Sequence, residues 1–265
     1  MMITEDLNFE IQEYAKSKYP EESCGLIVKE FDELTFVECE NTAKDKINHF
    51  AIDNSVMIKH SQYLFSIFHS HVESSTPAVT LSDINTCEAW NVPGSIVFLS
   101  HLDNKLCSDV VLYGKDIIYN TLKGRRYYYN VFDCFTLIRD FYFTTFNIDL
   151  PLVYSDYGWW ETTERADSLY LTQLKRLGME EFDITTELQI GDILAMKLGR
   201  SKCINHGAIY TGNGRVIHHL EGKLSVEENL GKYASRIERG MRRAKANNTT
   251  RDIGRKISKK LIISC

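Results

Sequence analysis

A length of 265 residues is enough for one large domain or two ordinary ones, and 43% hydrophobic with 25% charged residues is typical of a globular protein. No apolar run is long enough to span a membrane as a helix, and the N-terminal segment lacks the basic-then-apolar order of a signal peptide. The seven cysteines include no C-x-x-C pair, which argues against a disulfide framework and a thiolate zinc cage. We therefore expect a protein made in a reducing cytoplasm.

The charge is distributed unevenly along the chain. Residues 241–265 hold eight Lys and Arg and one Asp, a net charge of +7, while the whole chain carries −5 and its other residues therefore −12. A basic segment of this kind can bind nucleic acid, an acidic partner or an anionic surface, or it can remain solvated. No aromatic residues alternate with its basic ones, so we expect a solvated or partner-docked tail and no specific nucleic-acid site.

The first half alternates amphipathic runs with short apolar runs, which is typical of a mixed α/β domain. The amphipathic runs predict helices, and the β-branched and aromatic runs predict strands. In chain order these are a helix at about 4–18, a hairpin of strands at 24–30 and 34–40, an amphipathic stretch at about 54–65, a strand containing residues 66–71, a helix at 81–90 and a strand at 95–100.

The second half has its own set of elements after a join near residues 115–125. The predicted elements are helices at about 133–145 and 161–177, then strands at about 192–197, 206–211 and 215–219. The sequence therefore predicts an α+β (mixed α/β) fold with two domains, followed by a basic C-terminal tail. The boundaries that we assign are 1–118, 119–240 and 241–265.

The stretch FHSHVESSTPAVTLSD (68–83) predicts a metal site. His69 and His71 occupy alternate positions of a predicted strand, so both imidazoles point to one face. Together with Asp83 they form a set of two nitrogens and one carboxylate, which suits a catalytic zinc ion that keeps one position for water. The alternatives are core or exposed histidines on a strand, and Asp83 as an N-terminal helix cap.

Two further residues extend this pattern. Thr80 to Asp83 form the sequence [ST]-x-x-D, and Glu22 lies in the segment YPEESCGLIV (19–28). With the H-x-H pair, these residues resemble the JAMM/MPN metallopeptidase family over about residues 4–115. The resemblance implies a zinc ion (Zn2+) on the two histidines and Asp83, with Glu22 as general base and Thr80 helping to hold the tetrahedral oxyanion.

The segment departs from that family's pattern at three places. Val72 replaces the usual Pro after the second histidine, Thr80 replaces the usual Ser, and the spacer between the two motifs is one residue longer than the common form. The proposed metal ligands are unaffected by these changes.

The stretch YYYNVFDCFTLIRDFYF (127–143) predicts a helix whose N-cap is Asp133. Cys134 then lies in the first turn, where the positive end of the helix dipole favours a thiolate. A nucleophilic cysteine requires a histidine to take the thiol proton and a third polar group to orient that histidine. The alternative is a small buried thiol without a catalytic role.

The stretch INHGAIYTGNGRVIHH (204–219) supplies histidines for that purpose. T-G-N-G is a hairpin turn signal, which places His206 on the first strand and His218 on the second. His206 is the candidate base, and either His218 or His219 is the candidate orienting residue, because the sequence alone does not determine the strand register. The alternative is a pair of exposed hairpin histidines.

The D-C pair before a helix, the strand GDIL (191–194) and the spacing H-x-x-x-Y-x-G-x-G-x-x-x-H resemble the papain-like NlpC-type cysteine peptidases. These enzymes cut peptide bonds in bacterial cell-wall peptidoglycan. The resemblance implies Cys134, His206 and His218 as the catalytic residues. An upstream tyrosine often lines the oxyanion hole in that family, and here the tyrosines available are Tyr127, Tyr128 and Tyr129.

Most members of that family have Ser-Gly after the cysteine, where this chain has Phe135-Thr136. DCFTLIRDFY is instead similar to a phage branch, as are Gly124-Arg125 upstream and Trp159-Trp160 downstream. Together, the two domains resemble the tail assembly proteins of lambda-type phages over about residues 4–240.

That resemblance implies a protein made in the host cytoplasm and located at the virion tail tip. Its expected partners are other tail-tip proteins and a peptidoglycan peptide, and its expected role is tail assembly and local opening of the wall as DNA enters. One alternative is a structural tail-tip component with one or both sites unused. Others are a bacterial wall-remodelling enzyme, which the lack of a signal peptide argues against, and a peptidase of a ubiquitin-like system.

Overall fold

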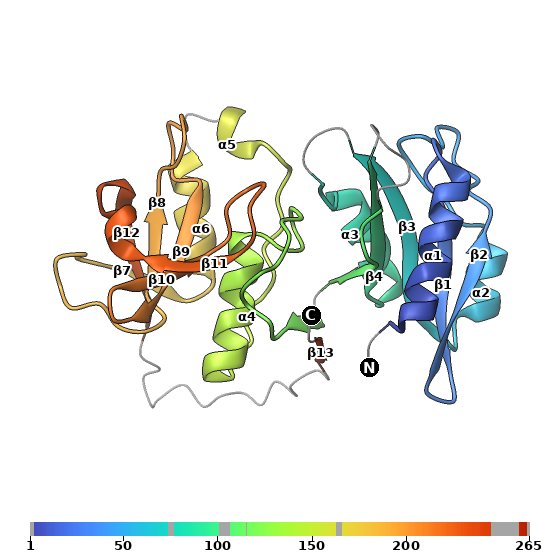
Figure 1. Cartoon of the computed structure of the whole chain (residues 1–265), viewed down its shortest axis with the longest axis horizontal. Coiled ribbons are helices and arrows are strands. Elements are labelled where there is room, and N and C mark those ends of the chain that lie inside the picture. Colours follow the sequence, from blue (N-terminus) through green and yellow to red (C-terminus); the bar gives the residue numbers. More distant parts are fainter. Residues whose placement is uncertain are drawn as a thin grey trace. The chain divides into compact units, whose positions relative to one another are not determined.

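The computed structural model of the chain describes residues 3–73, 77–100, 107–114, 116–162, 166–244 and 260–263. The chain divides into two compact units, Met1–Ile117 and Ile118–Cys265 (Figure 1). Both units combine helices with β-sheets, which confirms the mixed α/β class predicted from the sequence. No helix in the described ranges is long and apolar enough to cross a membrane.

The first unit is built on a five-stranded sheet in the order β2-β1-β3-β4-β5. Strand β3 runs parallel to β4, and the other neighbouring strands are antiparallel. The elements are α1 (Glu5–Lys18), β1 (Cys24–Glu30), β2 (Glu33–Cys39), α2 (Asn54–His60), β3 (Leu64–Glu73), α3 (Leu81–Trp90), β4 (Gly94–Ser100) and β5 (Val111–Tyr113). The predicted hairpin, histidine strand and helix at 81–90 are all present.

Helix α1 covers one face of this sheet. Its buried Leu7 and Ile11 belong to the same apolar core cluster as Phe68 on β3. Because side chains alternate along a strand, the next residue, His69, points to the opposite face, and His71 points with it. The packing of α1 therefore determines which face of the sheet carries the two histidines.

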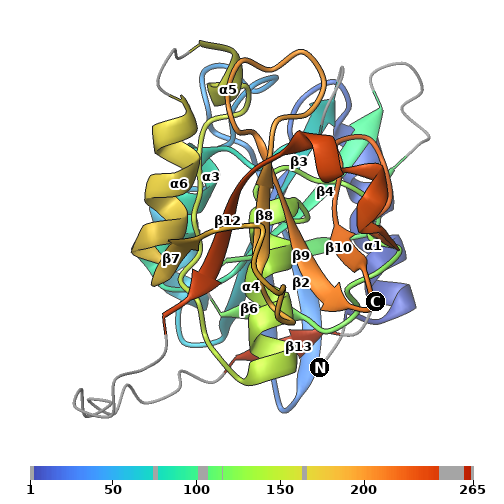
Figure 2. The ribbon, with the colours of Figure 1, turned by 90° about the vertical axis from the view of Figure 1, so that its left-hand side faces the viewer.

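The second unit is built on a six-stranded antiparallel sheet in the order β11-β10-β9-β8-β12-β7, whose strands β12, β8, β9 and β10 lie side by side in Figure 2. Its elements are β6 (Ile117–Tyr119), α4 (Cys134–Phe146), α5 (Trp159–Thr162), α6 (Ala166–Arg176), β7 (Met179–Phe182), β8 (Ile193–Met196), β9 (His206–Gly212), β10 (Arg215–His218), β11 (Val226–Asn229), β12 (Ile237–Arg243), β13 (Leu261–Ile263) and the 3-10 turns η1 (Leu230–Lys232) and η2 (Ala234–Arg236).

Helices α4 and α6 pack on this sheet through one apolar core. Ile138 and Phe141 of α4 and Leu174 of α6 form a cluster with Ile193 and Ile209 from the two central strands β8 and β9. The single helix predicted at 161–177 is observed as α5 and α6, and residues 163–165 lie outside the described residues.

The segment predicted as a basic tail contains ordered strands at both of its described ends. Its first residues, 241–243, belong to β12, and residues 261–263 form β13, which pairs with β6. Lys260 pairs with Asp149 at 3.0 Å, and Ile263 is buried. Residues 245–259, which hold most of the predicted positive charge, lie outside the described residues.

A buried ion pair connects the segment before α4 to that helix. The Arg125 guanidinium lies 2.8 Å from Asp140 Oδ2 and also donates to the carbonyls of Thr121 and Tyr119 at 2.5 and 2.6 Å. The two charged side chains are 0% and 4% exposed. Burial raises the pKa of Asp140 to about 6, even with the Arg125 charge beside it.

Replacing this arginine should destabilise the second unit strongly. We expect Arg125→Met to lower the free energy of unfolding by about 3 kcal/mol, because it leaves a buried carboxyl and two backbone carbonyls without this donor. Urea denaturation at neutral pH measures the change. The control is Lys123→Met, because Lys123 is 65% exposed in its pair with Glu227 and should contribute less than about 1 kcal/mol. Equal losses for the two variants would contradict this prediction.

Candidate active sites

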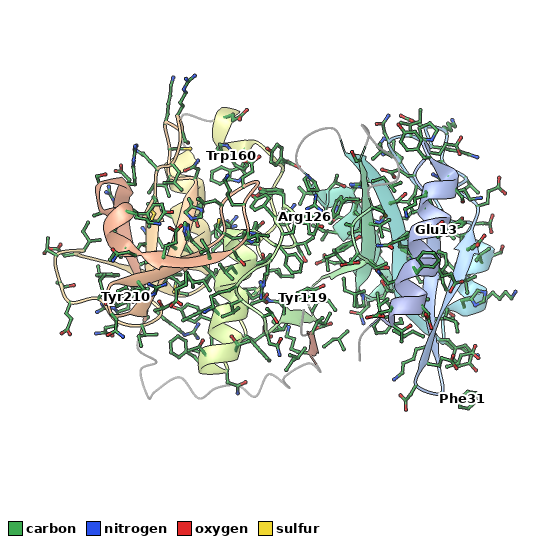
Figure 3. All side chains as sticks on the ribbon, viewed as in Figure 1. Glu13, Phe31, Tyr119, Arg126, Trp160 and Tyr210 are labelled. Atoms are coloured by element: carbon green, nitrogen blue, oxygen red, sulfur yellow. The ribbon has the colours of Figure 1, made fainter. Side chains whose placement is uncertain are left out.

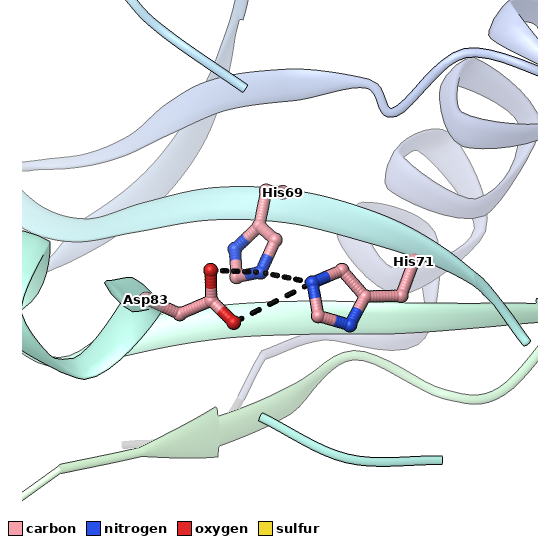
Figure 4. A group of neighbouring side chains, drawn as sticks. All are labelled: His69, His71 and Asp83. Carbon is pink, nitrogen blue, oxygen red and sulfur yellow. Dashed lines mark hydrogen bonds and ion pairs between the residues drawn. The ribbon is translucent and has the colours of Figure 1, made fainter. Parts of the chain in front are cut away.

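The first candidate site is a cluster of two imidazoles and one carboxylate, which we call the His-His-Asp cluster. Strand β3 supplies His69 and His71, and the first turn of α3 supplies Asp83 (Figure 4). The Nε2 atoms of the histidines lie 3.2 Å apart. Asp83 Oδ1 is 3.6 Å from His69 Nε2, and Asp83 Oδ2 is 3.4 Å from His71 Nε2. All three possible ligand atoms lie within 4.8 Å of one another.

The surroundings of the cluster orient both rings. The His69 ring stacks on Phe50 with 4.5 Å between the ring centroids, and its side chain is fully buried. His71 Nδ1 lies 3.0 Å from the carbonyl oxygen of Ala78, so it carries the proton and leaves the Nε2 electron pair facing Asp83. Among the described residues, His69 Nδ1 has no hydrogen-bond partner.

Asp83 takes part in both a helix cap and the cluster. Thr80 is the N-cap residue of α3, and Asp83 is the third helical residue of the capping box, so the alternative that Asp83 caps the helix is confirmed in part: Asp83 contributes to the cap but is not the N-cap. Its Oδ2 accepts from Thr80 N and Thr80 Oγ1, both at 2.8 Å, which leaves Oδ1 facing His69. Burial alone would raise the pKa of Asp83, but the hydrogen bond and the charge interaction with His69 hold it below its usual range.

Glu22 lies beside the cluster, on the loop that leads into β1. It is 5% exposed, and its Oε1 is 3.5 Å from His71 Nε2. Three hydrogen bonds at 2.8 to 3.0 Å between Ser23 and Ser70 attach this loop to β3, at the position between the two histidines. The structure thus brings together all the residues of the first predicted site, through a serine pair that the sequence patterns did not indicate.

The donor set of the cluster fits a zinc ion. Two imidazole nitrogens and one carboxylate oxygen are a common catalytic zinc set. A second carboxylate at 3.5 Å from one ligand is close enough to exchange a proton with a group bound there. Two of the three candidate ligands are held in place: His69 by its burial, and Asp83 by its position in the capping box of α3.

The second candidate site, which we call the cysteine site, begins at the N-terminus of α4. Asp133 is the N-cap, and its Oδ1 accepts from Thr136 N at 2.9 Å while Thr136 Oγ1 accepts from Asp133 N at 2.9 Å. Cys134 is therefore the first residue of the helix, as predicted. The departure from Ser-Gly at Phe135-Thr136 has a local reason, because the threonine hydroxyl completes the capping box.

The thiol of Cys134 is partly buried, and its Sγ lies 3.7 Å from Tyr170 Oη. Burial, together with the neighbouring Asp133 carboxylate, raises the pKa of Cys134 to about 12. Burial thus opposes the helix dipole, which favours a thiolate at this position. A nucleophilic Cys134 therefore needs a base to remove the thiol proton. The close position of Tyr170 depends on Gly207, because a Cβ at that residue would collide with Tyr170 Oη.

The hairpin of β9 and β10 brings two histidines together. His206 Nε2 lies 3.1 Å from His218 Nδ1, and the two side chains are 4% and 0% exposed. Burial lowers the pKa of His206 to about 3 and also lowers the pKa of His218. Both rings are therefore neutral near pH 7, and a neutral imidazole is able to accept a thiol proton.

His219 has different neighbours. Its Nε2 lies 3.2 Å from the carbonyl oxygen of Lys223, and its ring meets Tyr127 edge to face with 5.2 Å between centroids. Of the two histidines that the sequence left open as the third residue, His218 is the one in contact with His206.

A cavity of about 870 Å³ joins the cysteine site to a wall of aromatic side chains. Cys134 and His206 line it, and so do Tyr127 and Tyr129, two of the three tyrosines considered for the oxyanion hole. The third, Tyr128, instead forms an isolated β-bridge with Phe132. The other Phe, Trp and Tyr residues that line it are Phe135, Trp159, Trp160 (labelled in Figure 3), Tyr170 and Tyr233.

The chain is similar in sequence to one protein family and to two phage proteins. Residues 123–243 match the NlpC/P60 family. The chain is 27% identical over 225 residues to the tail tip assembly protein K of Escherichia phage N15, which covers 84% of this chain and 88% of that protein. It is also 36% identical over 107 residues to the tail tip assembly protein K of Escherichia phage lambda. That alignment covers 40% of this chain and 51% of the lambda protein. These similarities confirm the resemblance to lambda-type tail assembly proteins.

Two solved structures are more distantly similar to the chain. A solution structure of a protein from Desulfitobacterium hafniense has 21% identity and a TM-score of 0.32, and covers 43% of this chain and 84% of its own. A crystal structure of a JAB1/MPN domain protein from Archaeoglobus fulgidus has 21% identity and a TM-score of 0.26, and covers 43% of this chain and 89% of its own. At TM-scores this low, neither match establishes a fold.

Proposed function

We propose that this homologue of tail tip assembly protein K, with its NlpC/P60 domain in residues 123–243, is a peptidoglycan endopeptidase that acts at the phage tail tip. It would be made in the host cytoplasm, assemble with other tail-tip proteins and open the cell wall locally as DNA enters. The observation that carries the proposal is the cysteine site: a helix-terminal thiol and His206 line one large cavity, and His218 contacts His206. Digestion of purified cell walls by wild type and by Cys134→Ala tests it.

The cysteine site supports acyl transfer through the following steps. His206 takes the thiol proton, and Cys134 Sγ attacks the carbonyl carbon of the wall peptide to form a tetrahedral intermediate. Protonated His206 then gives its proton to the leaving amine, and the peptide carbon remains bound to sulfur as a thioester. Water attacks the thioester while His206 takes a proton from it, and the free carboxylic acid and the thiol are released.

The negative charge that develops on the carbonyl oxygen of the tetrahedral intermediate requires hydrogen-bond donors. The backbone N–H of Cys134, the first residue of α4, lies at the N-terminal end of the helix and is the first candidate donor, because Thr136 N already donates to Asp133 Oδ1. The hydroxyl of Tyr127, which lines the same cavity, would be the second donor, because the Tyr129 hydroxyl already contacts Ser155 Oγ at 2.5 Å and the carbonyl oxygen of Asp156 at 3.3 Å. His218, in contact with His206 Nε2, orients the base.

Tyr170 contributes a hydrogen bond to the reacting sulfur. We expect Tyr170→Phe to lower the rate of Cys134 alkylation by iodoacetamide about tenfold below the pKa of the thiol, because a hydroxyl donor stabilises the thiolate more than the thiol. The measurement is the rate of modification at Cys134 against pH, read by mass spectrometry. Tyr142→Phe is the matched control, since its hydroxyl donates to the Gly191 carbonyl at 2.7 Å. An unchanged rate in Tyr170→Phe would rule out this contribution.

For the first unit, we propose a zinc-dependent, isopeptidase-like site, in line with the resemblance to the JAMM/MPN family. His69, His71 and Asp83 would hold the ion, which when bound would acidify water and polarise a carbonyl group. Glu22 Oε1 would take a proton from the water and deliver it to the leaving amine. Thr80 would assist at the oxyanion by turning its hydroxyl away from Asp83 Oδ2, its partner in the capping box.

A further inference from the structure

A carboxylate on β11 continues the hydrogen-bond chain of the cysteine site. Glu228 Oε1 lies 3.4 Å from His218 Nε2, the ring nitrogen that faces away from His206. Tyr233 Oη donates to the same oxygen at 3.0 Å, and Lys232 pairs with Oε2. The hydrogen bond from Lys232 is the main reason that the pKa of Glu228 lies below its usual value, so the group is ionised at neutral pH.

We propose that Glu228 is a positioning residue of the cysteine site, which selects the tautomers of His218 and His206. The inference rests on the proposed roles of Cys134 and the two histidines. It assigns the residue a role that acts through His218.

The tautomers follow from the donor and acceptor roles of each group. An ionised carboxylate only accepts, so His218 Nε2 must carry the proton that it shares with Glu228. Neutral His218 then has a bare Nδ1, which accepts from the Nε2–H of His206 across 3.1 Å. Neutral His206 carries its proton on Nε2, so its own Nδ1 is unprotonated. That atom is the base that a thiol proton requires, so the charge on Glu228 prepares His206 for the first step.

Strand pairing explains why Glu228 and not its neighbour has this position. In the register of β10 with β11, Val216 lies opposite Glu228 and His218 opposite Val226, so His218 and Glu228 share one face of the sheet. Glu227 lies opposite Ile217 and points to the other face, where it accepts from Thr211 at 2.8 Å. Glu227 is thus a matched control, with the same charge one residue away.

The test compares Glu228→Gln with Glu227→Gln in the full chain. Because Gln is able to donate as well as accept, it no longer forces a proton onto His218 Nε2. We expect kcat for release of wall peptide to fall about 10- to 100-fold in Glu228→Gln with KM within about twofold, and Glu227→Gln to stay near wild type. Glu228→Asp keeps the charge and should recover part of the loss.

Nitrogen-15 NMR of labelled histidine provides a readout that does not depend on activity. Wild type should show His218 protonated at Nε2 and bare at Nδ1, and Glu228→Gln should lose that preference. Matching spectra for the two glutamine variants, or equal kcat values, would overturn the role of Glu228. Failure of the proposed function would look different, because wild type itself would then release no peptide.

The acidic limb of the pH profile of kcat gives a further check on the role of Glu228. The charged or titratable groups around His218 are His206, Glu228, Lys232, Tyr233 and His219. Removing the one negative charge among them favours the neutral imidazoles, so the acidic limb should move to lower pH in Glu228→Gln. A profile that coincides with that of Glu227→Gln would contradict the proposal.

Discussion

Cys134→Ala is expected to reduce the release of peptides from purified cell walls at least about 10³-fold, to the level without enzyme. The variant removes the sulfur that forms the thioester, and no other described cysteine lines the 870 Å³ cavity that holds His206. The measurement is digestion of purified sacculi by reduced protein, with the released peptides identified by mass spectrometry. The masses also identify the bond that is cut.

Two variants make this experiment specific. Cys203→Ala removes a buried thiol of the same unit and should retain wild-type release. His69→Ala alters the His-His-Asp cluster and should also retain it, if the wall is cut at the cysteine site. Loss in His69→Ala alone would instead assign wall cleavage to the first unit. No release from any folded form would favour a structural role in the tail tip.

His69→Ala is expected to remove zinc from the protein. We expect about one equivalent of zinc per chain in purified wild type and almost none in the variant, because the ion would lose one of its three protein ligands. Elemental analysis measures the metal content. Competition with a chromogenic chelator should show an affinity at least about 10²-fold lower in the variant.

The control for this experiment is His60→Ala, at the C-terminal end of α2 and outside the cluster. It should retain the metal, and zinc should raise the melting temperature of this control and of wild type but not that of His69→Ala. Metal-free wild type with an intact fold would contradict the assignment of zinc to His69, His71 and Asp83.

Local patterns were sufficient for the elements that carry the two sites. Alternation along a strand predicted that His69 and His71 share a face, and their Nε2 atoms lie 3.2 Å apart on β3. A cap residue followed by an apolar helical stripe predicted the start of α4 at Cys134. These features depend on residues close together in the sequence, so the sequence contains the information for them.

Strands that depend on their partners were missed. The two outer strands of the six-stranded sheet, β7 and β11, have the sequences MEEF and VEEN, in which two of four residues are glutamates. Such segments show little apolar alternation, because an outer strand packs fewer side chains into the core. Their conformation comes from pairing with β12 and β10, which no local pattern records.

The sequence by itself indicated the metal-ligand set of the first candidate site, the cysteine and histidines of the second, and the type of element that carries each of them. Only the tertiary structure decided that His218 and not His219 contacts His206 and that Tyr170 reaches the sulfur of Cys134. It also decided that the Glu228 carboxylate contacts Nε2 of His218. These choices depend on strand register and on the packing of α6, which arise from contacts between segments far apart in the chain. A shift of one residue in the register would reverse the face of every side chain on β10, and no motif within β10 prevents it.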